Sequence, residues 1–271
     1  MKIAITTIAT GKYDVFVPSL IDSCEKYFLP NLEKNYFVFT DSDKILSSDK
    51  VVKVNQNKLG WPYDTMMRFH MFERIEKMLS ETNFCFFMNA NMEVVSEIDI
   101  SILPSSKNDG IVAFLHPGFF DQSKCKYTYE RRKESNFCVP EGCENFYYQG
   151  CFFGGESSAF LEMTSILKKM MDDDLSNGIT PLWHDESALN WYLLDKNPLV
   201  LNPGFGYPEY INLEEILNIY VQQKLPIDLE IVAEILRSSK KNLYQHVLND
   251  FEIKIIQRSK IRHGGQNFLR A

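Results

Sequence analysis

The stretch 84-FCFFMNANMEVV-95 decides the fold class that the sequence predicts. Its first five residues are apolar without alternation, as in a strand that is covered on both faces in the middle of a sheet. The run stops at Asn89-Ala90-Asn91, where two amide side chains follow the strand directly. Because open α/β sheets bind ligands at the carboxyl ends of their strands, the stretch predicts a central strand with a binding site at its end.

Strand and helix patterns alternate on both sides of this stretch. Apolar, β-rich runs predict strands at 2–9, 36–41, 51–56, 111–116 and 146–155, with a short one at 252–256. Helical spacing predicts helices at 14–29, 62–80, 157–173, 213–223 and 228–248, and a further helix that begins within 183–194. The helix over 62–80 should begin at Pro62 and bury Met66, Phe69, Phe72, Ile75 and Met78. The pattern predicts an α/β domain with a largely parallel sheet, and an irregular segment over 118–148.

Composition and charge exclude several classes of protein. The chain has 29 Lys and Arg against 36 Asp and Glu, a net charge of −7, which argues against a general binder of nucleic acid or anionic membranes. We find no signal-peptide pattern and no run near the roughly 20 apolar residues that span a bilayer. We therefore expect a cytoplasmic protein, with peripheral attachment to the inner membrane left open. The six cysteines form no CxxC pair and are interpreted as reduced packing residues.

Asn89-Ala90-Asn91 raises the question of a metal site. Two carboxylates at this spacing after a buried strand would hold Mg²⁺ or Mn²⁺ and bridge it to substrate phosphates. Asparagine offers only neutral carbonyl oxygens, which lack the charge that offsets dehydration of the ion. The other interpretation is that these asparagines form a turn after the strand.

A second motif, 183-WHDES-187, suits sugar chemistry. A Trp ring can stack on a pyranose face, while carboxylates bind hydroxyls or meet a developing oxocarbenium ion. The alternative is a helix start, in which Asp185 and Glu186 favour the positive end of the helix dipole.

Three further motifs have both a functional and a purely structural interpretation. In 116-HPGFF-120, His116 is either a ligand-contacting residue or a hydrogen-bonded core histidine. The cluster 127-YTYERR-132 is either part of a site or a solvated face. The glycines of 150-GCFFGG-155 predict close approach of a backbone or ligand, or else a bulge.

Taken together, the motifs resemble glycosyltransferase family 6, which includes the vertebrate blood-group A and B transferases, α-1,3-galactosyltransferase and bacterial relatives. The resemblance runs from about Ile3 to about Pro203 through ATGKYD, YFVFTD, MNANME, LHPGFF, YTYERR, FYYQGCFFGG and WHDESALN, in order. It implies a nucleotide-sugar transferase fold of the A type (GT-A), a single domain over 1–271 with a mixed, mostly parallel central sheet. Within it, 1–100 would bind UDP, 101–211 would bind acceptor and donor sugar, and 212–271 would be a helical extension with a basic tail.

The resemblance also implies roles for individual residues. The uridine pocket would include Ala9, Thr10 and Tyr13, and Arg68 would contact the donor. The donor sugar would be selected by Gln149, Gly150 and Cys151 and bound by Asp185. His116 and Trp183 would contact the acceptor, and Glu186 would be the carboxylate beside the anomeric carbon.

The activity implied is retaining α-1,3 transfer of N-acetylgalactosamine or galactose from a UDP-sugar to a β-galactoside, with a fucosylated, blood-group-H-like oligosaccharide as one form of acceptor. This chain has the Asn-X-Asn form found in some bacterial members, so we expect Asn89 and Asn91 at the donor, and no metal or other cofactor. Positive charge would come instead from Arg68 and from the tail residues Lys260, Arg262 and Arg270. Cys151 stands where relatives carry Gly or Ala, which leaves the donor sugar open.

Three alternatives remain at the level of the sequence. One is a carbohydrate-binding pseudoenzyme of the same fold, against which the intact WHDES run with Glu186 argues. Another is a metal-dependent transferase that uses a different carboxylate such as Glu93. The third, a dinucleotide-dependent enzyme, is disfavoured because no GxGxxG follows 2-KIAITTIA-9.

Overall fold

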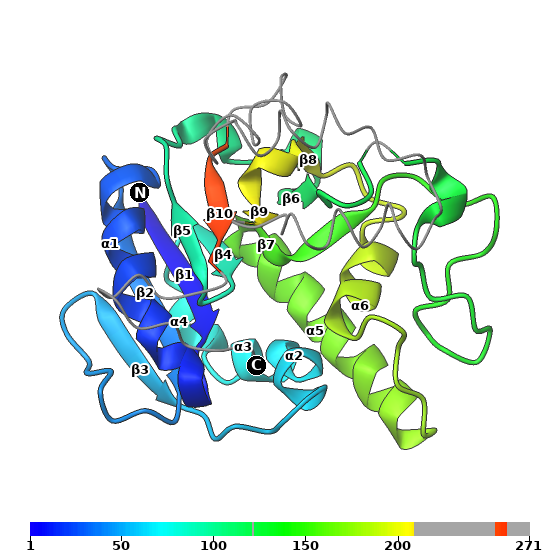
Figure 1. Ribbon diagram of the computed structural model, residues 1–271, viewed down its shortest axis with the longest axis horizontal. Helices are drawn as coiled ribbons and strands as arrows, with labels where there is room; N and C mark the ends of the chain where they lie inside the picture. The colour runs from blue at the N-terminus through cyan, green and yellow to red at the C-terminus, as the bar shows by residue number, and fades with distance from the viewer. Residues whose placement is uncertain (121, 209–252, 259–271) are drawn as a thin grey trace, which may run out of the picture.

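The computed structural model describes residues 1–120, 122–208 and 253–258, and its core is one seven-stranded sheet (Figure 1). The strand order is β3-β2-β1-β4-β7-β6-β8. The strands are β1 Lys2–Ile8, β2 Glu33–Thr40, β3 Val51–Asn55, β4 Phe84–Met88, β6 Ile111–Leu115, β7 Tyr148–Glu156 and β8 Leu199–Leu201. All neighbours are parallel except β7, which runs antiparallel to both β4 and β6. The expected mixed, mostly parallel α/β sheet is confirmed.

Strand β4 lies in the middle of the sheet, between β1 and β7, as its apolar run predicts. Phe86 and Met88 belong to the hydrophobic cluster on one face, and Cys85 and Phe87 to the cluster on the other. Both faces are therefore covered, which is why the strand does not alternate with polar residues. Directly after it, the Met92 amide donates to the Asn89 carbonyl at 3.0 Å, so the chain turns at the carboxyl edge of the sheet.

Helices cover the two faces of the sheet unequally. After η1 Gly11–Phe16, helix α1 Val17–Tyr27 packs its apolar side into the first cluster. The second cluster is closed by α3 Arg68–Glu73, α5 Ser157–Ser176 and α6 Asp185–Tyr192. The remaining short 3-10 turns are η2 Ile100–Ile102, η3 Ser106–Asn108, η4 Lys124–Lys126 and η5 Pro203–Phe205. Apart from η4, the segment over 118–148 is irregular, as expected, up to the start of β7.

The single helix expected over 62–80 is wrong. The structure has three short helices, α2 Tyr63–Met66, α3 Arg68–Glu73 and α4 Glu76–Ser80, with Pro62 before the first. The apolar residues recur every three positions, and in a continuous α-helix that spacing drifts by about 60° per step. Breaks at Met67 and Ile75 offset the drift for most of the set, but Met78 is 38% exposed.

A smaller sheet brings a distant segment beside the Asn-X-Asn turn. Its order is β5-β10-β9, made of β5 Met92–Val94, β10 Ile255–Gln257 and β9 Tyr207–Pro208. β10 confirms the strand expected at 252–256, with shifted bounds. β5, β8 and β9 are too short for the sequence to indicate. The helices expected at 213–223 and 228–248 lie outside the described residues.

The glycines of β7 are explained by close approach, with a bulge in the neighbouring strand. A Cβ on Gly155 would lie 2.1 Å from the Gly110 carbonyl oxygen, and one on Gly154 would lie 2.4 Å from the Phe86 ring. The register of β6 against β7 shifts between Ala113 and Leu115. The sheet is continuous across residue 100, and the assignment of its halves to UDP and acceptor stays a prediction. Among the described residues, none of the helices has the length and apolar character of a membrane span.

Candidate active site

A hollow of about 210 Å³ opens where β4 and β7 meet the first turn of α6. It is lined by Trp61, Thr65, Arg68, Asn89, Gln149, Gly150, Cys151, Trp183, His184, Asp185, Glu186 and Gln257. The fold thus gathers eight of the residues expected at the donor, acceptor or reaction centre from four separate stretches of chain. Trp61, Thr65, His184 and Gln257 are lining residues that the sequence did not single out.

Glu186 is held by both of its carboxylate oxygens. Oε2 accepts from the Gly150 amide at 2.9 Å, and Oε1 accepts from the Tyr147 hydroxyl at 3.1 Å. Burial raises the pKa of Glu186 to about 7; nearby Asp185 also raises it, while the hydrogen bonds and Arg68 oppose the rise. The arrangement gives a fixed carboxylate that changes charge near neutral pH, which is typical of a catalytic carboxyl group.

A buried ion pair lies beside this carboxylate. Arg68 Nη1 lies 2.9 Å from Asp185 Oδ2, and the same nitrogen donates to the Gly150 carbonyl at 2.5 Å. The guanidinium also sits over the Phe87 ring, 4.2 Å from its centroid. Burial lowers the pKa of Arg68 and raises that of Asp185, and each charge opposes the shift of the other. Among the described residues, Arg68 Nε is buried and has no hydrogen-bond partner, so the protein does not satisfy every N–H of this cation.

Helix α6 is fixed to β7 so that its acidic first turn faces the hollow. Asn190 accepts from the Tyr148 amide and donates to the Tyr148 carbonyl, both at 2.8 Å. A Cβ on Gly150 would lie 3.0 Å from Asp185 Oδ2, so the strand and the carboxylate are in close contact there. His184, directly before α6, has φ 56°, a conformation that costs about 1–3 kcal/mol for a non-glycine residue and clusters at functional sites.

Two exposed tryptophans border the hollow. Trp61 is 72% exposed and Trp183 is 46% exposed. The Trp61 ring meets the His184 ring edge-on, with centroids 4.7 Å apart. Large apolar rings left in solvent beside polar groups are suited to stack on a sugar face. The only sequence signal for Trp61 was its position before Pro62.

His116 lies next to Tyr147 and does not line the hollow. Its amide donates to the Tyr147 carbonyl at 2.9 Å, and the two rings are 5.8 Å apart. Burial lowers the pKa of His116 to about 4, and its Nδ1 accepts from the Gly118 amide at 3.0 Å. The imidazole is therefore neutral and partly satisfied by its own turn.

The residues expected at the uridine lie at the carboxyl end of β1 but not among the hollow's lining. Ala9 and Thr10 are buried, and Tyr13 is exposed. Strand β1 is the parallel neighbour of β4, with Thr6 paired to Phe87, so this end of β1 opens on the same edge of the sheet as Asn89. Lys260, Arg262 and Arg270 lie outside the described residues.

Asn91 faces the C-terminal segment. Its Nδ2 donates to the Arg258 carbonyl at 3.0 Å, and the Arg258 amide donates to the Asn91 carbonyl at 2.7 Å. Glu93 accepts from Arg258 Nε at 2.6 Å and from Ser19 at 3.2 Å. The Asn91 amide and the Glu93 carboxylate thus both make contacts to Arg258. Within the described ranges, no group of three His, Cys, Asp or Glu side chains is placed to hold a metal ion.

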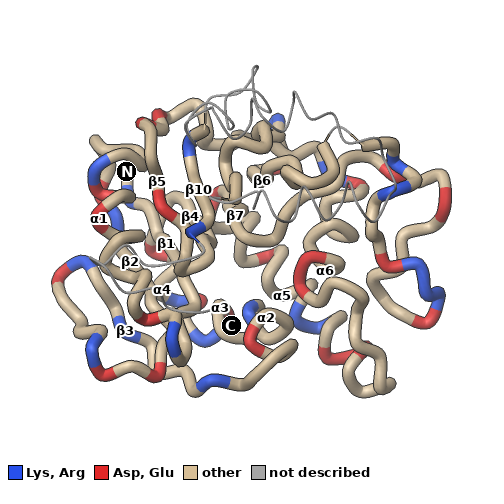
Figure 2. Tube along the Cα trace, in the orientation of Figure 1, with Lys and Arg blue, Asp and Glu red and all other residues tan. Residues whose placement is uncertain are grey.

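The YTYERR segment is partly buried and not a solvated face. Glu130 is 2% exposed and accepts from the Leu182 amide at 2.8 Å, one residue before Trp183. Its partner Arg132 donates to Glu130 Oε2 at 2.6 Å and to the Thr180 carbonyl at 2.5 Å. Figure 2 shows the Lys and Arg of this irregular segment at one end of the molecule, and the acidic start of α6.

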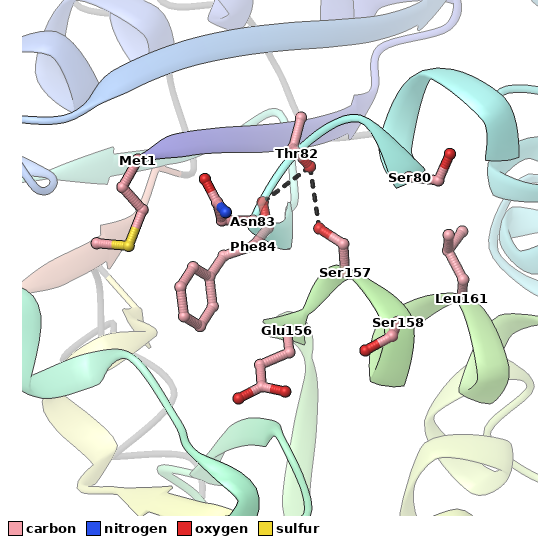
Figure 3. A pocket seen from close by; sticks show the side chains of 9 residues that line it. All are labelled: Met1, Ser80, Thr82, Asn83, Phe84, Glu156, Ser157, Ser158 and Leu161. Atoms are coloured by element: carbon pink, nitrogen blue, oxygen red, sulfur yellow. Dashed lines mark hydrogen bonds between the residues drawn. The ribbon is translucent and has the colours of Figure 1, made fainter.

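A second hollow, of about 470 Å³, lies at the opposite edge of the sheet (Figure 3). It is lined by Met1, Ser80, Thr82, Asn83, Phe84, Glu156, Ser157, Ser158 and Leu161. Although larger, it has no cation and no aromatic pair, and its Thr82 and Ser157 hydroxyls bond each other at 3.0 Å. The smaller hollow beside Glu186 is therefore the candidate active site.

Comparison with known proteins identifies the family of the chain. Residues 1–227 match the model of glycosyltransferase family 6, and the chain belongs to that family. It is a glycosyltransferase, and such an enzyme takes a sugar from an activated donor to an acceptor.

Individual relatives support the assignment. The chain is 35% identical over 226 residues to an O-antigen biosynthesis glycosyltransferase (WbnI) of Escherichia coli, covering 83% of this chain and 95% of that protein. It is 29% identical to histo-blood group ABO system transferase 2 of Rattus norvegicus, over 77% of this chain and 64% of that one. It is 30% identical to globoside alpha-1,3-N-acetylgalactosaminyltransferase 1 of Gallus gallus, over 78% and 62%. The match thus spans less than two thirds of these two vertebrate relatives.

Proposed function

We propose that the protein is a retaining α-1,3-glycosyltransferase that moves N-acetylgalactosamine or galactose from a UDP-sugar to a β-galactoside, without a metal ion. The observation that carries the proposal is Glu186, a buried carboxylate held by Gly150 and Tyr147 beside the Arg68–Asp185 pair. The α-1,3 linkage is also in the name of the globoside relative. A cytoplasmic location is part of the proposal.

Retention of configuration needs a group on the face of the sugar opposite the leaving UDP, or stabilisation of a short-lived ion pair. In either case the bond from the anomeric carbon to UDP breaks, and a bond to the acceptor oxygen forms with loss of the hydroxyl proton. Glu186 would attack the anomeric carbon or stabilise its positive charge. Asp185 would bind a donor-sugar hydroxyl, Gln149, Gly150 and Cys151 would shape the sugar pocket, and Trp183 and His116 would contact the acceptor.

Positive charge at the leaving UDP would come from the protein. Departure of UDP leaves negative charge on the diphosphate, which fixed cations stabilise. Arg68 lines the hollow, and Asn89 lies at the edge where Ala9, Thr10 and Tyr13 would receive the uridine. We include Lys260, Arg262 and Arg270 in the proposal as further cations, which follow β10 in the sequence and lie outside the described residues.

Two observations favour the metal-free form over a metal-dependent one. The amide of Asn91 is a donor to Arg258, a bond that a carboxylate at this position could not make. Glu93, the example of another carboxylate that a metal could recruit, is paired with Arg258.

A transfer assay tests the proposal. Fucosyllactose and lactose are offered with UDP-N-acetylgalactosamine, UDP-galactose or UDP-glucose as a control donor. We expect a product one sugar larger by mass spectrometry with one of the first two donors, and an α-1,3 linkage by NMR. Binding of the acceptor without transfer from any of these donors would instead indicate a carbohydrate-binding protein.

A further inference from the structure

We propose that Thr128 and Tyr147 are positioning residues that aim the Glu186 carboxylate through a hydrogen-bond relay. The inference rests on the proposed role of Glu186 in transfer. It assigns a function to part of the YTYERR segment, which lies outside the hollow itself.

The relay has a defined direction. Thr128 Oγ1 donates to the Tyr147 hydroxyl oxygen at 2.9 Å, and the Tyr147 hydroxyl donates to Glu186 Oε1 at 3.1 Å. The hydroxyl has a single proton, and its other acceptor, the Thr128 carbonyl, is farther away at 3.4 Å. Because the Thr128 hydroxyl donates to the Tyr147 hydroxyl oxygen, the proton of the Tyr147 hydroxyl is directed to Glu186.

The tyrosine ring is held so that its hydroxyl cannot move away. Tyr147 is 2% exposed, and its ring lies 4.9 Å from that of Phe119, 5.2 Å from Tyr129 and 5.7 Å from Tyr127. The hydroxyl is thus a fixed donor at the end of a packed aromatic cluster, which is the property needed to hold a catalytic group in one orientation.

Glu130, two residues after Thr128, anchors the same segment. Burial alone would raise the pKa of Glu130, but hydrogen bonds from Arg132 and from the Leu182 amide outweigh it and lower the pKa to about 2. Glu130 is therefore ionised over the working range and ties the YTYERR segment to the loop that leads into α6. The segment that carries Thr128 is thus anchored to the loop before α6, the helix that carries Glu186.

The relay also bears on the charge of Glu186. Within the described residues, the groups that act on its carboxyl include the Gly150 amide, Tyr147 and Cys151 on the side of β7, Asp185 from its own helix, and Arg68 from α3. The Tyr147 hydrogen bond favours the ionised form, so its loss should raise the pKa of Glu186 further.

Tyr147→Phe, Thr128→Val and Thr128→Ser test the relay, with Tyr129→Phe as a matched control. Tyr129 belongs to the same aromatic cluster, but its hydroxyl donates to the Phe146 carbonyl at 2.6 Å and not to Glu186. Tyr147→Phe should lower kcat by about 10- to 100-fold, with the donor KM within about threefold, and move the acidic limb of the pH profile to higher pH. Thr128→Val should act in the same direction, and Thr128→Ser should restore wild-type behaviour.

Equal effects of Tyr129→Phe and Tyr147→Phe, or an unmoved pH profile in Tyr147→Phe, would overturn the relay. A different result would contradict the proposed function, namely that the wild-type protein transfers no sugar. In that case an infrared titration of the Glu186 carboxyl, assigned with Glu186→Gln, still reads the relay without activity. A pKa that is the same in wild type and Tyr147→Phe would contradict it, and a higher one in the variant would support it.

Discussion

Glu186→Gln should lower kcat for glycosyl transfer by about 10³-fold, while the donor KM stays within about threefold. A loss of that size corresponds to about 4 kcal/mol of transition-state stabilisation. The physical reason is that glutamine keeps the shape of the side chain but carries no negative charge for the anomeric centre. Initial rates measured over a range of donor concentrations separate the two constants.

The pH profile gives an independent test of the same residue. Burial raises the pKa of Glu186 to about 7, and the account requires the ionised form. As the pH falls through that value the carboxylate is protonated, so kcat/KM should fall on the acidic side with a midpoint near about 7. Residual activity of Glu186→Gln should lack this limb.

Glu162→Gln is the matched control, because Glu162 is exposed on α5 and outside the hollow. It should leave both kcat and the profile unchanged. A Glu186→Gln enzyme with more than about a tenth of wild-type kcat would remove this residue from the centre of the mechanism.

Arg68→Met should affect stability and transfer together. Removing the guanidinium leaves the Asp185 carboxylate buried without its partner, and breaking a buried pair from one side costs about 3–5 kcal/mol of unfolding free energy. Transfer should fall by about 10²-fold or more, because the leaving diphosphate loses a fixed cation. Urea unfolding and initial rates measure the two effects.

The double variant Arg68→Met with Asp185→Asn separates the two roles. With both charges gone, no buried carboxylate is left unpaired, so about half or more of the lost stability should return. Transfer should not return, because the cation is still missing and the donor sugar has also lost the Asp185 carboxylate. Recovery of activity along with stability would mean that Arg68 serves the fold alone.

The central strand and the site at its end could be predicted because each rests on a local pattern. Phe84–Met88 is apolar on both faces, and that alone places it between two neighbours in a covered sheet. The WHDES run could be placed at a helix start, and the fold confirms that Asp185 and Glu186 begin α6. Arg68 and Glu186 meet through a long-range contact, and only the family resemblance predicted that both belong to one site.

Other features depend on tertiary contacts that a one-dimensional pattern does not contain. The breaks in 62–80 follow from packing against the sheet, and Trp61, just before the first of these short helices, lines the hollow. The position of Asn91 depends on its hydrogen bond to Arg258. This residue directly follows β10 and is 167 positions further along the chain. The Glu130 carboxylate is bonded to the Leu182 amide, in a loop that is distant in the sequence. The charged residues of YTYERR alone therefore could not distinguish a buried segment from a solvated face.

The measurement that tests the central claim most directly is transfer by the wild-type protein in excess EDTA, compared with transfer after Mn²⁺ is restored. If Arg68 and the other cations of the chain stabilise the charge on the leaving group, the initial rate should be the same in both conditions. Transfer that appears only with Mn²⁺ would contradict it.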